Sequence, residues 1–261
     1  TSRTYVPDPI GRVYLVLGSS ITPGQTFDLA NADYIFTGEQ DNDSFGLTLA
    51  AIGDYDGDGL DDLAFGAKWL TNGRGIAYMV LGSSLGANQH INMEDADTTF
   101  YTLDYGSHLG QGIAGPGDVN GDGLADILIG QNGRIHVILG TPHVQKERHI
   151  DSADFTVIGS GAIGESISPA GDVDGDGLDD FLFASTSYQY YGSNPNGRVH
   201  LMMGSSIGPQ TSISIESTDY KFVSGYDWNL GLQVSPAGDV DGDGLDDILF
   251  GSSASDITGE N

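Results

Sequence analysis

Short apolar runs recur along the chain, and segments rich in Gly, Asp, Asn and Ser separate them. Four of these runs follow one pattern, namely "LAFGA" (63–67), "ILIGQ" (127–131), "FLFAS" (181–185) and "ILFGS" (248–252). Runs this short, bounded by turn-forming residues, are typical of β-strands. No stretch of about 10–15 residues has the apolar spacing of an amphipathic helix. The pattern therefore predicts an all-β protein.

An acidic segment stands immediately before each of the four runs. The segments are "GDYDGDGLDD" (53–62), "GDVNGDGLAD" (117–126) and "GDVDGDGLDD" (171–180 and 238–247). Nine residues before each first aspartate stands an apolar residue followed by glycine, in the pairs Phe45-Gly46, Leu109-Gly110, Ile163-Gly164 and Leu230-Gly231. The first aspartates lie at 54, 118, 172 and 239, so the copies are 64, 54 and 67 residues apart. Periods of this size indicate a repeat architecture.

Each complete unit contains two further strand-like runs after the acidic segment. A "GR" turn opens one in "GRGIAYMVLG" (73–82), "GRIHVILG" (133–140) and "GRVHLMMG" (197–204), and an aspartate opens the next in "DTTFYTL" (97–103), "DFTVIG" (154–159) and "DYKFVSG" (219–225). Four short strands per unit at this period are what the antiparallel blades of a β-propeller require. We therefore expect blades at about 45–103, 109–159 and 163–225.

The phase of the units suggests how a fourth blade could be completed. The unit at 230–251 contains only the first two of the four strand-like runs. Runs of the third and fourth kind occur instead within 11–38, as "GRVYLVLG" (11–18) and "DYIFTG" (33–38). We expect one domain over 1–261, in which these N-terminal strands close a four-bladed ring and hide its edges. Two alternatives stay open: the chain is a fragment of a larger ring, or two chains pair into eight blades.

The charge of the chain excludes several partners. Its 37 acidic residues against nine Lys and Arg give a net charge of −28. Such a chain repels nucleic acid and anionic membrane surfaces. No apolar run approaches the roughly 18 residues of a membrane span, and no secretion signal is visible at the start, so such a signal is absent or already removed. The absence of cysteine excludes disulfides and thiolate metal sites.

The acidic segments have the composition and spacing of a calcium loop. Carboxylates at loop positions 1, 3 and 5 can face inward if the loop curls tightly, which Gly57 and Gly59 permit. Position 7 would add a backbone carbonyl (Leu60) and position 9 a carboxylate (Asp62). The second copy has Ala125 at position 8 but keeps an aspartate at position 9, which favours position 9 as the ligand.

Three other interpretations of these loops are disfavoured. An EF-hand needs a bidentate glutamate at position 12, where this chain has Phe65, Ile129, Phe183 and Phe250. Magnesium demands a strict octahedron and keeps its waters. A solvated Asx-rich turn would not require four copies in register.

The combination of an "FG" pair, GD-x-D-G-D-G-x-x-D and a "GR" turn resembles the FG-GAP repeats of the integrin α-subunit propeller and its bacterial relatives. The resemblance covers about 11–251, but the integrin propeller has seven blades, and the "GAP" half is degraded here to "FGA", "IGQ", "FAS" and "FGS". It implies four Ca²⁺ sites with ligands at loop positions 1, 3, 5, 7 and 9. The implied ligands are Asp54, Asp56, Asp58, Leu60 and Asp62; Asp118, Asn120, Asp122, Leu124 and Asp126; Asp172, Asp174, Asp176, Leu178 and Asp180; and Asp239, Asp241, Asp243, Leu245 and Asp247.

Calcium sites of this class are filled outside cells, so we expect an extracellular or cell-surface protein. Its loops opposite the calcium loops hold a candidate face for a protein or glycan ligand, made of Lys68, Trp69, Tyr105, His108, Tyr188, Tyr190, Tyr191, Tyr226 and Trp228. Alternatively, these side chains only cap the blades.

The expected function is adhesion or recognition. The alternatives are a structural spacer in a large calcium-dependent surface protein, or an accessory domain of a polysaccharide-active enzyme. We expect no enzyme in this chain, because no nucleophile motif occurs and His136 and His200 occupy strand positions where other copies have Tyr14 and Tyr78.

Overall fold

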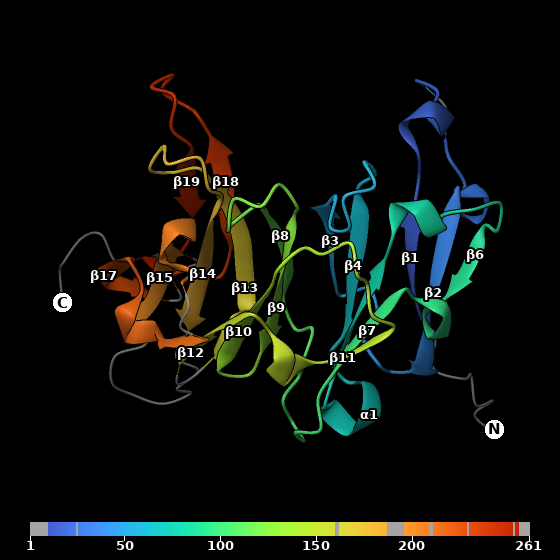
Figure 1. The fold of residues 1–261 in the computed structure, drawn as a ribbon, viewed down its shortest axis with the longest axis horizontal. Coiled ribbons are helices and arrows are strands. Elements are labelled where there is room, and N and C mark those ends of the chain that lie inside the picture. Colours follow the sequence, from blue (N-terminus) through green and yellow to red (C-terminus); the bar gives the residue numbers. More distant parts are fainter. Residues whose placement is uncertain are drawn as a thin grey trace.

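The computed structural model describes residues 10–24, 26–159, 162–186, 196–208, 211–228, 230–252 and 254–255. Within them the protein is built from β-sheets and short turns (Figure 1). The 3-10 turns are η1 (Gly18–Ser20), η2 (Leu29–Asn31), η3 (Gly82–Ser84), η4 (Met93–Asp95), η5 (Ile150–Ser152), η6 (Gly204–Ser206) and η7 (Ile215–Ser217). The single-turn element α1 (Leu70–Gly73) contains two residues with left-handed dihedrals. The all-β prediction is confirmed.

Three five-stranded sheets form the middle of the molecule. The first has the order β11 (Glu147–His149), β7 (Thr98–Tyr101), β5 (Ile76–Val80), β4 (Asp62–Ala67), β3 (Thr48–Gly53). The second has the order β16 (Ser212–Ser214), β12 (Phe155–Ile158), β10 (Arg134–Ile138), β9 (Asp126–Gln131), β8 (Ile113–Gly117). The third has the order β13 (Ala162–Gly171), β14 (Asp180–Thr186), β15 (Asn196–Met202), β17 (Tyr220–Trp228), β20 (Ala254–Ser255).

A smaller sheet lies at each end of the array. One contains β1 (Ile10–Leu15), β2 (Tyr34–Asp41) and β6 (His90–Asn92), and the other contains β18 (Val234–Gly238) and β19 (Asp247–Phe250). Figure 1 shows β18 left of centre and β1 at the right, with β8, β3 and β4 between them. None of the described strands joins these two end sheets. Closure within one chain is therefore not confirmed, and the terminal strands form two separate half-sheets.

The four strands expected in each unit pair antiparallel and in chain order. In the first unit β3 pairs with β4, β4 with β5 and β5 with β7. A further strand of three residues, which the sequence pattern did not indicate, joins three of the sheets in parallel. Thus β6 pairs with β2, β11 with β7 and β16 with β12. Each of these short strands comes from the unit that follows along the chain, so it ties neighbouring units together.

The apolar core lies between neighbouring sheets. Phe36 of β2 packs in one cluster with Tyr78 of β5, and Met79 of β5 packs in another with Ile127 of β9. The next interface contains Val137 and Phe181, and the last contains Leu182 with the partly buried Ile248 of β19. Each strand in this series presents one face to the sheet before it and the other to the sheet after it. Sheets buried on both faces explain the near-continuous apolar runs in the sequence.

All four acidic loops lie at one end of the sheets. They connect β3 to β4, β8 to β9, β13 to β14 and β18 to β19, whereas α1 lies at the opposite end (Figure 1). The strands that precede the loops contact one another in succession, β3 with β8, β8 with β13 and β13 with β18. The repeat therefore places the acidic loops side by side in a row, and it separates them from the face that carries α1.

Candidate metal centres and the opposite face

The aspartate at loop position 1 organises each acidic loop. Both oxygens of Asp54 accept backbone N–H bonds, Oδ1 from Gly57 at 2.8 Å and Oδ2 from Gly59 at 2.9 Å. Asp118, Asp172 and Asp239 make the same pair of bonds in their loops. The two glycines adopt positive φ, 81° at Gly57 and 88° at Gly59, which side-chain-bearing residues rarely adopt. The predicted role of the glycines in curling the loop is confirmed.

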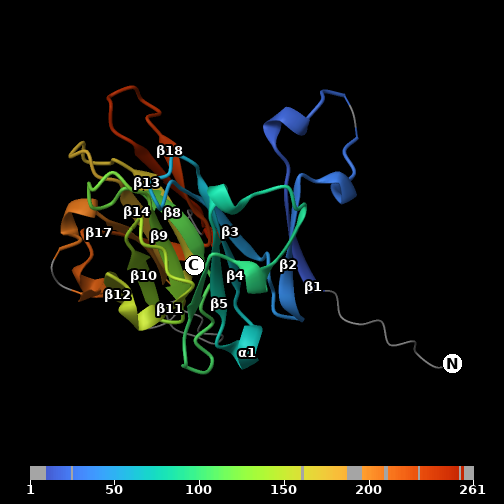
Figure 2. The same cartoon turned by 45° about the vertical axis from the view of Figure 1, so that its right-hand side comes forward.

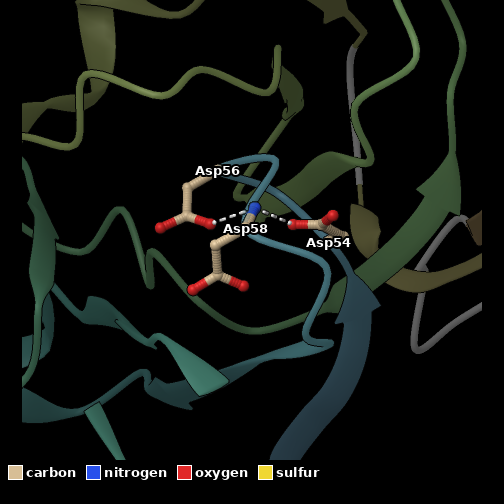
Figure 3. A group of neighbouring side chains, drawn as sticks. All are labelled: Asp54, Asp56 and Asp58. Atoms are coloured by element: carbon tan, nitrogen blue, oxygen red, sulfur yellow. Dashed lines mark hydrogen bonds between the residues drawn. The ribbon is translucent and has the colours of Figure 1, made fainter. Parts of the chain in front are cut away.

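Carboxylates at alternate loop positions converge on the centre of the curl. Figure 3 shows the side chains of Asp54 and Asp56 on either side of the Asp58 backbone nitrogen, which donates to both at 3.0 and 3.1 Å. One oxygen from each of Asp54, Asp56 and Asp58 lies within 4.8 Å of the others. The same separation holds for Asp172, Asp174 and Asp180, and for Asp239, Asp241 and Asp247. Two ligands of one Ca²⁺ are at most about 5 Å apart, so the donor set fits this ion.

The second loop differs at position 3, as its sequence predicts. The amide Oδ1 of Asn120 accepts from the Asp122 nitrogen at 2.8 Å, and the amide nitrogen donates to Asp122 Oδ2 at 2.9 Å. This loop keeps an oxygen donor at position 3 but has one carboxylate fewer. One oxygen of Asp122 is also engaged by the amide. The loop therefore carries less negative charge toward a cation than the other three.

The aspartate at position 9 ties each of the first three loops to the scaffold. Asp62 is buried, and its two oxygens accept from the backbone nitrogens of Tyr55 at 2.9 Å and Gly82 at 2.8 Å. Asp126 and Asp180 repeat both bonds, with Gly140 and Gly204 as the second donors. Burial raises the pKa of Asp62 and Asp180 to about 6 and that of Asp126 to about 7. A carboxylate in this position is costly to ionise unless a cation compensates it.

The residue at position 8, which the sequence made a poorer ligand candidate than position 9, links neighbouring loops. The Asp179 nitrogen donates to the Asp118 carbonyl at 3.0 Å, and Asp179 Oδ2 accepts from the Asp118 nitrogen at 2.8 Å. Asp246 makes the same pair of contacts with Asp172. Ala125 donates its backbone nitrogen to Asp54 at 3.0 Å but has no carboxylate to return the second bond. This structural role of position 8 could have been predicted from the sequence, because position 8 is aspartate in three of the four copies.

On the opposite face, four of the nine predicted ligand residues have described side chains. Trp69 is 48% exposed and its ring centroid lies 4.4 Å from that of His108. Tyr105 is 73% exposed, and the guanidinium carbon of Arg74 lies 4.0 Å above its ring centroid. The fourth residue, Lys68, precedes Trp69 in the chain, and its side chain is partly buried. Tyr188, Tyr190 and Tyr191 lie outside the described residues, as do the side chains of Tyr226 and Trp228.

The connection at 105–109 and the α1 turn are joined through their backbones. His108 donates its backbone nitrogen to the Gly73 carbonyl at 3.1 Å, and Leu109 donates to the Arg74 carbonyl at 2.9 Å. Three non-glycine residues here, Thr71, Asn72 and His108, have positive φ between 53° and 63°. Such strain is uncommon and gathers at functional sites. We name Trp69, Arg74, Tyr105 and His108 the aromatic patch; sequence reasoning missed Arg74.

The two histidines assigned to strands are indeed buried in β10 and β15. His136 contacts Gln131 Oε1 at 2.9 Å and Thr156 Oγ1 at 3.2 Å, and His200 contacts Ser185 Oγ and Thr218 Oγ1, both at 3.0 Å. Burial lowers the pKa of each imidazole to about 4. Both rings are therefore neutral, satisfied core groups. No helix in the described part of the chain is long and apolar enough to cross a membrane.

Comparison with known proteins finds similar repeats in a known family of repeats and in integrin α-subunits. A model of the FG-GAP repeat matches residues 45–79, and a model of the FG-GAP-like repeat matches 118–183. The chain is 27% identical over 259 residues to integrin alpha pat-2 of Caenorhabditis briggsae, covering 90% of this chain and 20% of that protein. It is 28% identical over 234 residues to integrin alpha-PS2 of Drosophila melanogaster, covering 82% and 16% respectively.

A human relative matches a shorter stretch of the chain at a higher sequence identity. Integrin alpha-IIb of Homo sapiens is 33% identical over 125 residues, which is 48% of this chain and 11% of that protein. The chain thus spans at most about a fifth of the length of these relatives. The chain therefore contains segments that match the FG-GAP and FG-GAP-like repeats, and over most of its length it is similar to integrin α-subunits.

Proposed function

We propose that this protein is a calcium-stabilised extracellular recognition module, whose sheets are the blades of a β-propeller. The observation that carries the proposal is the row of four acidic loops with one shared geometry. Each loop curls around a position 1 aspartate, and three of them bring three carboxylate oxygens within 4.8 Å of one another. Calcium is the hard cation whose ligand distances this spacing accommodates. Its relationship to integrin α-subunits supports a role in adhesion or recognition.

In this proposal the protein's own residues prepare the loops for the ion. Backbone N–H groups hold the position 1, 3 and 5 carboxylates, and the buried position 9 carboxylate anchors the loop to the strand that follows the "GR" turn. The proposed ligands remain those of positions 1, 3, 5, 7 and 9. A bound divalent ion would supply the positive charge that offsets the clustered carboxylates.

Equilibrium dialysis against Ca²⁺ tests the metal proposal. We expect four ions per chain, with the weakest affinity at the loop that contains Asn120. The variant Asp58→Asn should remove or weaken one site and leave three, because it neutralises an exposed carboxylate without changing its size. Asp61→Asn, one position outside the proposed ligand set, is the matched control and should keep four. Fewer than two ions bound in millimolar calcium would refute the proposal.

The aromatic patch is the part of the opposite face that we propose contacts a protein or glycan ligand. Trp69 and Tyr105 are exposed, and Arg74 and His108 hold their rings in place. Exposed aromatic residues with polar neighbours supply large contact area at low entropic cost.

A glycan array and a panel of immobilised matrix proteins, probed with labelled protein in calcium, test this assignment. The double variant Trp69→Ala/Tyr105→Ala should lose at least tenfold in signal, while Ile158→Ala, a similarly exposed apolar residue on β12, should not. Equal binding by both variants would exclude the patch. Absence of signal with the unmodified protein on both supports would favour the structural spacer.

A further inference from the structure

The first complete unit places the arginine of its "GR" motif differently from the two units that follow. Ile76 on β5, Arg134 on β10 and Arg198 on β15 are structurally equivalent, because each lies opposite the fifth residue after a position 9 aspartate. Arg74 stands two residues before Ile76, directly after α1, which lies beyond the ends of β4 and β5 (Figure 2). The motif therefore puts an arginine on a strand in two units, but in the turn before the strand in the first.

The two strand arginines are paired with acidic residues, whereas Arg74 is not. Arg134 Nη1 lies 3.9 Å from Asp151 Oδ1, and Arg198 Nη1 lies 3.5 Å from Glu216 Oε1. No ion pair within the described residues includes Arg74, although the η4 turn carries a glutamate at the same repeat position as these two acids. In a chain with 37 acidic residues, this cation is left without a carboxylate partner in the described structure.

The Arg74 guanidinium lies instead on an exposed aromatic ring, 4.0 Å from the centroid of Tyr105. Its Nε atom is buried and has no hydrogen-bond partner. Only one other buried side-chain nitrogen or oxygen in the described chain is in this state, Oε1 of Gln111, which belongs to the same connection between β7 and β8. Buried polar atoms without partners are uncommon and costly, and they point to a site that a ligand completes.

The backbone around this arginine is held from both sides. The Arg74 carbonyl accepts from Ser107 Oγ at 2.5 Å and from the Leu109 nitrogen at 2.9 Å. A Cβ at Gly75 would lie 2.2 Å from the Leu109 carbonyl oxygen, so the turn and the connection are in close contact. From the next unit, the Asn132 nitrogen donates to the Ser107 carbonyl at 2.8 Å. A ligand that binds here spends little free energy on ordering the backbone.

We propose that the aromatic patch binds a hexuronate glycan whose carboxylate pairs with Arg74. This proposal rests on the proposed function of the patch as a ligand face, and it adds the chemical class of the ligand. A guanidinium is a planar fork whose parallel N–H donors match the two oxygens of a carboxylate. The exposed rings of Trp69 and Tyr105 offer apolar faces to the C–H groups of a sugar ring.

The local charges favour a ligand group with one negative charge. Phosphate recognition uses clusters of arginines, whereas here one arginine is unpaired and Asp104 stands exposed beside Tyr105. An acidic peptide would also pair with Arg74, but the side chain of aspartate or glutamate has no ring to cover Trp69 and Tyr105. Charges more than about 8 Å apart are largely screened at physiological ionic strength, so the negative charge elsewhere on the chain does not prevent this contact.

Isothermal titration calorimetry at constant free calcium gives the first test. The probes are short fragments of oligogalacturonate, oligomannuronate and hyaluronan, each measured beside its methyl ester. The ester keeps the sugar ring and removes the charge, so this control leaves the protein unaltered. We expect at least one acid to bind, and its ester to bind at least about tenfold more weakly, because a charge-assisted contact is lost. Equal binding of acid and ester would overturn the carboxylate assignment.

Substitutions test the role of the arginine. Arg74→Gln should weaken hexuronate binding at least about tenfold, and Arg74→Lys should recover only part of the loss, since lysine keeps the charge but not the planar fork. Arg134→Gln removes a "GR" arginine that is already paired with Asp151, so it is the matched control and should bind as the unmodified protein does. Unchanged binding by Arg74→Gln, or an equal loss in both glutamine variants, would overturn the proposal.

Two further outcomes separate this proposal from the proposed function on which it rests. Binding of poly-glutamate through Arg74, without binding of any hexuronate, would identify an acidic protein segment as the ligand and overturn the glycan assignment alone. Hexuronate binding that survives in the Trp69→Ala/Tyr105→Ala variant would place the sugar elsewhere on the chain, and it would remove both the present proposal and the patch as the ligand face.

Discussion

At the scale of single residues, the loops combine two kinds of aspartate that the sequence does not distinguish. Aspartates at positions 3 and 5 are mostly exposed and point into the curl, whereas those at position 9 in the first three loops are fully buried and satisfy two backbone donors. Spacing and the resemblance to FG-GAP repeats together assigned all of them to one ligand set. Their separate structural roles depend on the glycine that ends the strand after the "GR" turn, about 14 to 24 residues away.

This difference predicts unequal effects of substitution at positions 5 and 9. Asp126→Ala leaves the buried nitrogens of Val119 and Gly140 without acceptors, so we expect a loss of roughly 2–4 kcal/mol in the free energy of unfolding even without calcium. Asp122→Ala should cost less than half as much in EDTA. Urea denaturation of both variants in EDTA at low temperature provides the comparison. Equal losses would show that position 9 acts only through the metal.

The buried histidines predict a loss of stability in acid. His200 takes up its proton at about pH 4 when folded, because burial disfavours the charged ring, but near its ordinary value of about 6.5 when unfolded. A depressed folded pKa of a base means that stability is complete above about pH 6.5 and falls as the pH drops toward 4. The contribution of one such ring reaches about 3 kcal/mol over that interval.

His200→Gln should therefore flatten the fall in stability between pH 7 and pH 5, since glutamine keeps polar atoms near Ser185 and Thr218 but does not titrate. Urea midpoints measured at each pH in saturating calcium supply the data. Parallel curves for wild type and His200→Gln would contradict the assignment.

At the scale of elements, the four antiparallel strands and the acidic turn of each unit could be predicted from the sequence because their signals are local. Alternating turns and apolar runs mark the strands, and paired glycines mark the loop. The parallel strands β6, β11 and β16 could not be predicted, because each has only three residues and forms through a sheet that belongs to another unit. The position 8 bridges were missed for a related reason, since their partners lie 61 and 74 residues away.

The missing bridge at Ala125 predicts a stabilising substitution. Ala125→Asp should place a carboxylate against the Asp54 nitrogen, as Asp179 does against Asp118, and raise stability in calcium by about 0.5–1.5 kcal/mol. In EDTA the gain should shrink or reverse, because another negative charge then joins an uncompensated cluster. Thermal melts in both buffers measure the effect. Ala87→Asp adds the same charge on an exposed turn, and a similar gain from it would rule out the bridge.

At the scale of the whole molecule, the charge of −28 and the four acidic loops make calcium a central expected determinant of stability. Four sites with the affinity of extracellular modules, each at about 10 to 100 times its dissociation constant, would together contribute about 6–11 kcal/mol. In a chain of this length, that corresponds to a melting temperature at least about 10 °C lower in EDTA.

Differential scanning calorimetry in calcium and in EDTA measures this shift. The same EDTA melt with added NaCl is the control, because screening by monovalent salt should recover only part of the loss. A melting temperature that does not change with EDTA would remove calcium from the account of stability. Full recovery by NaCl would mean that the loops need ionic strength rather than a bound ion.

The short parallel strands make the repeats depend on one another for their integrity. In a linear solenoid each repeat adds its own increment of stability and can fray from the end. Here the loss of one unit would also strip β11 or β16 from the edge of the unit before it. The middle three sheets should therefore melt in one cooperative transition. A substitution that disrupts a single loop should also speed amide hydrogen exchange in the neighbouring units.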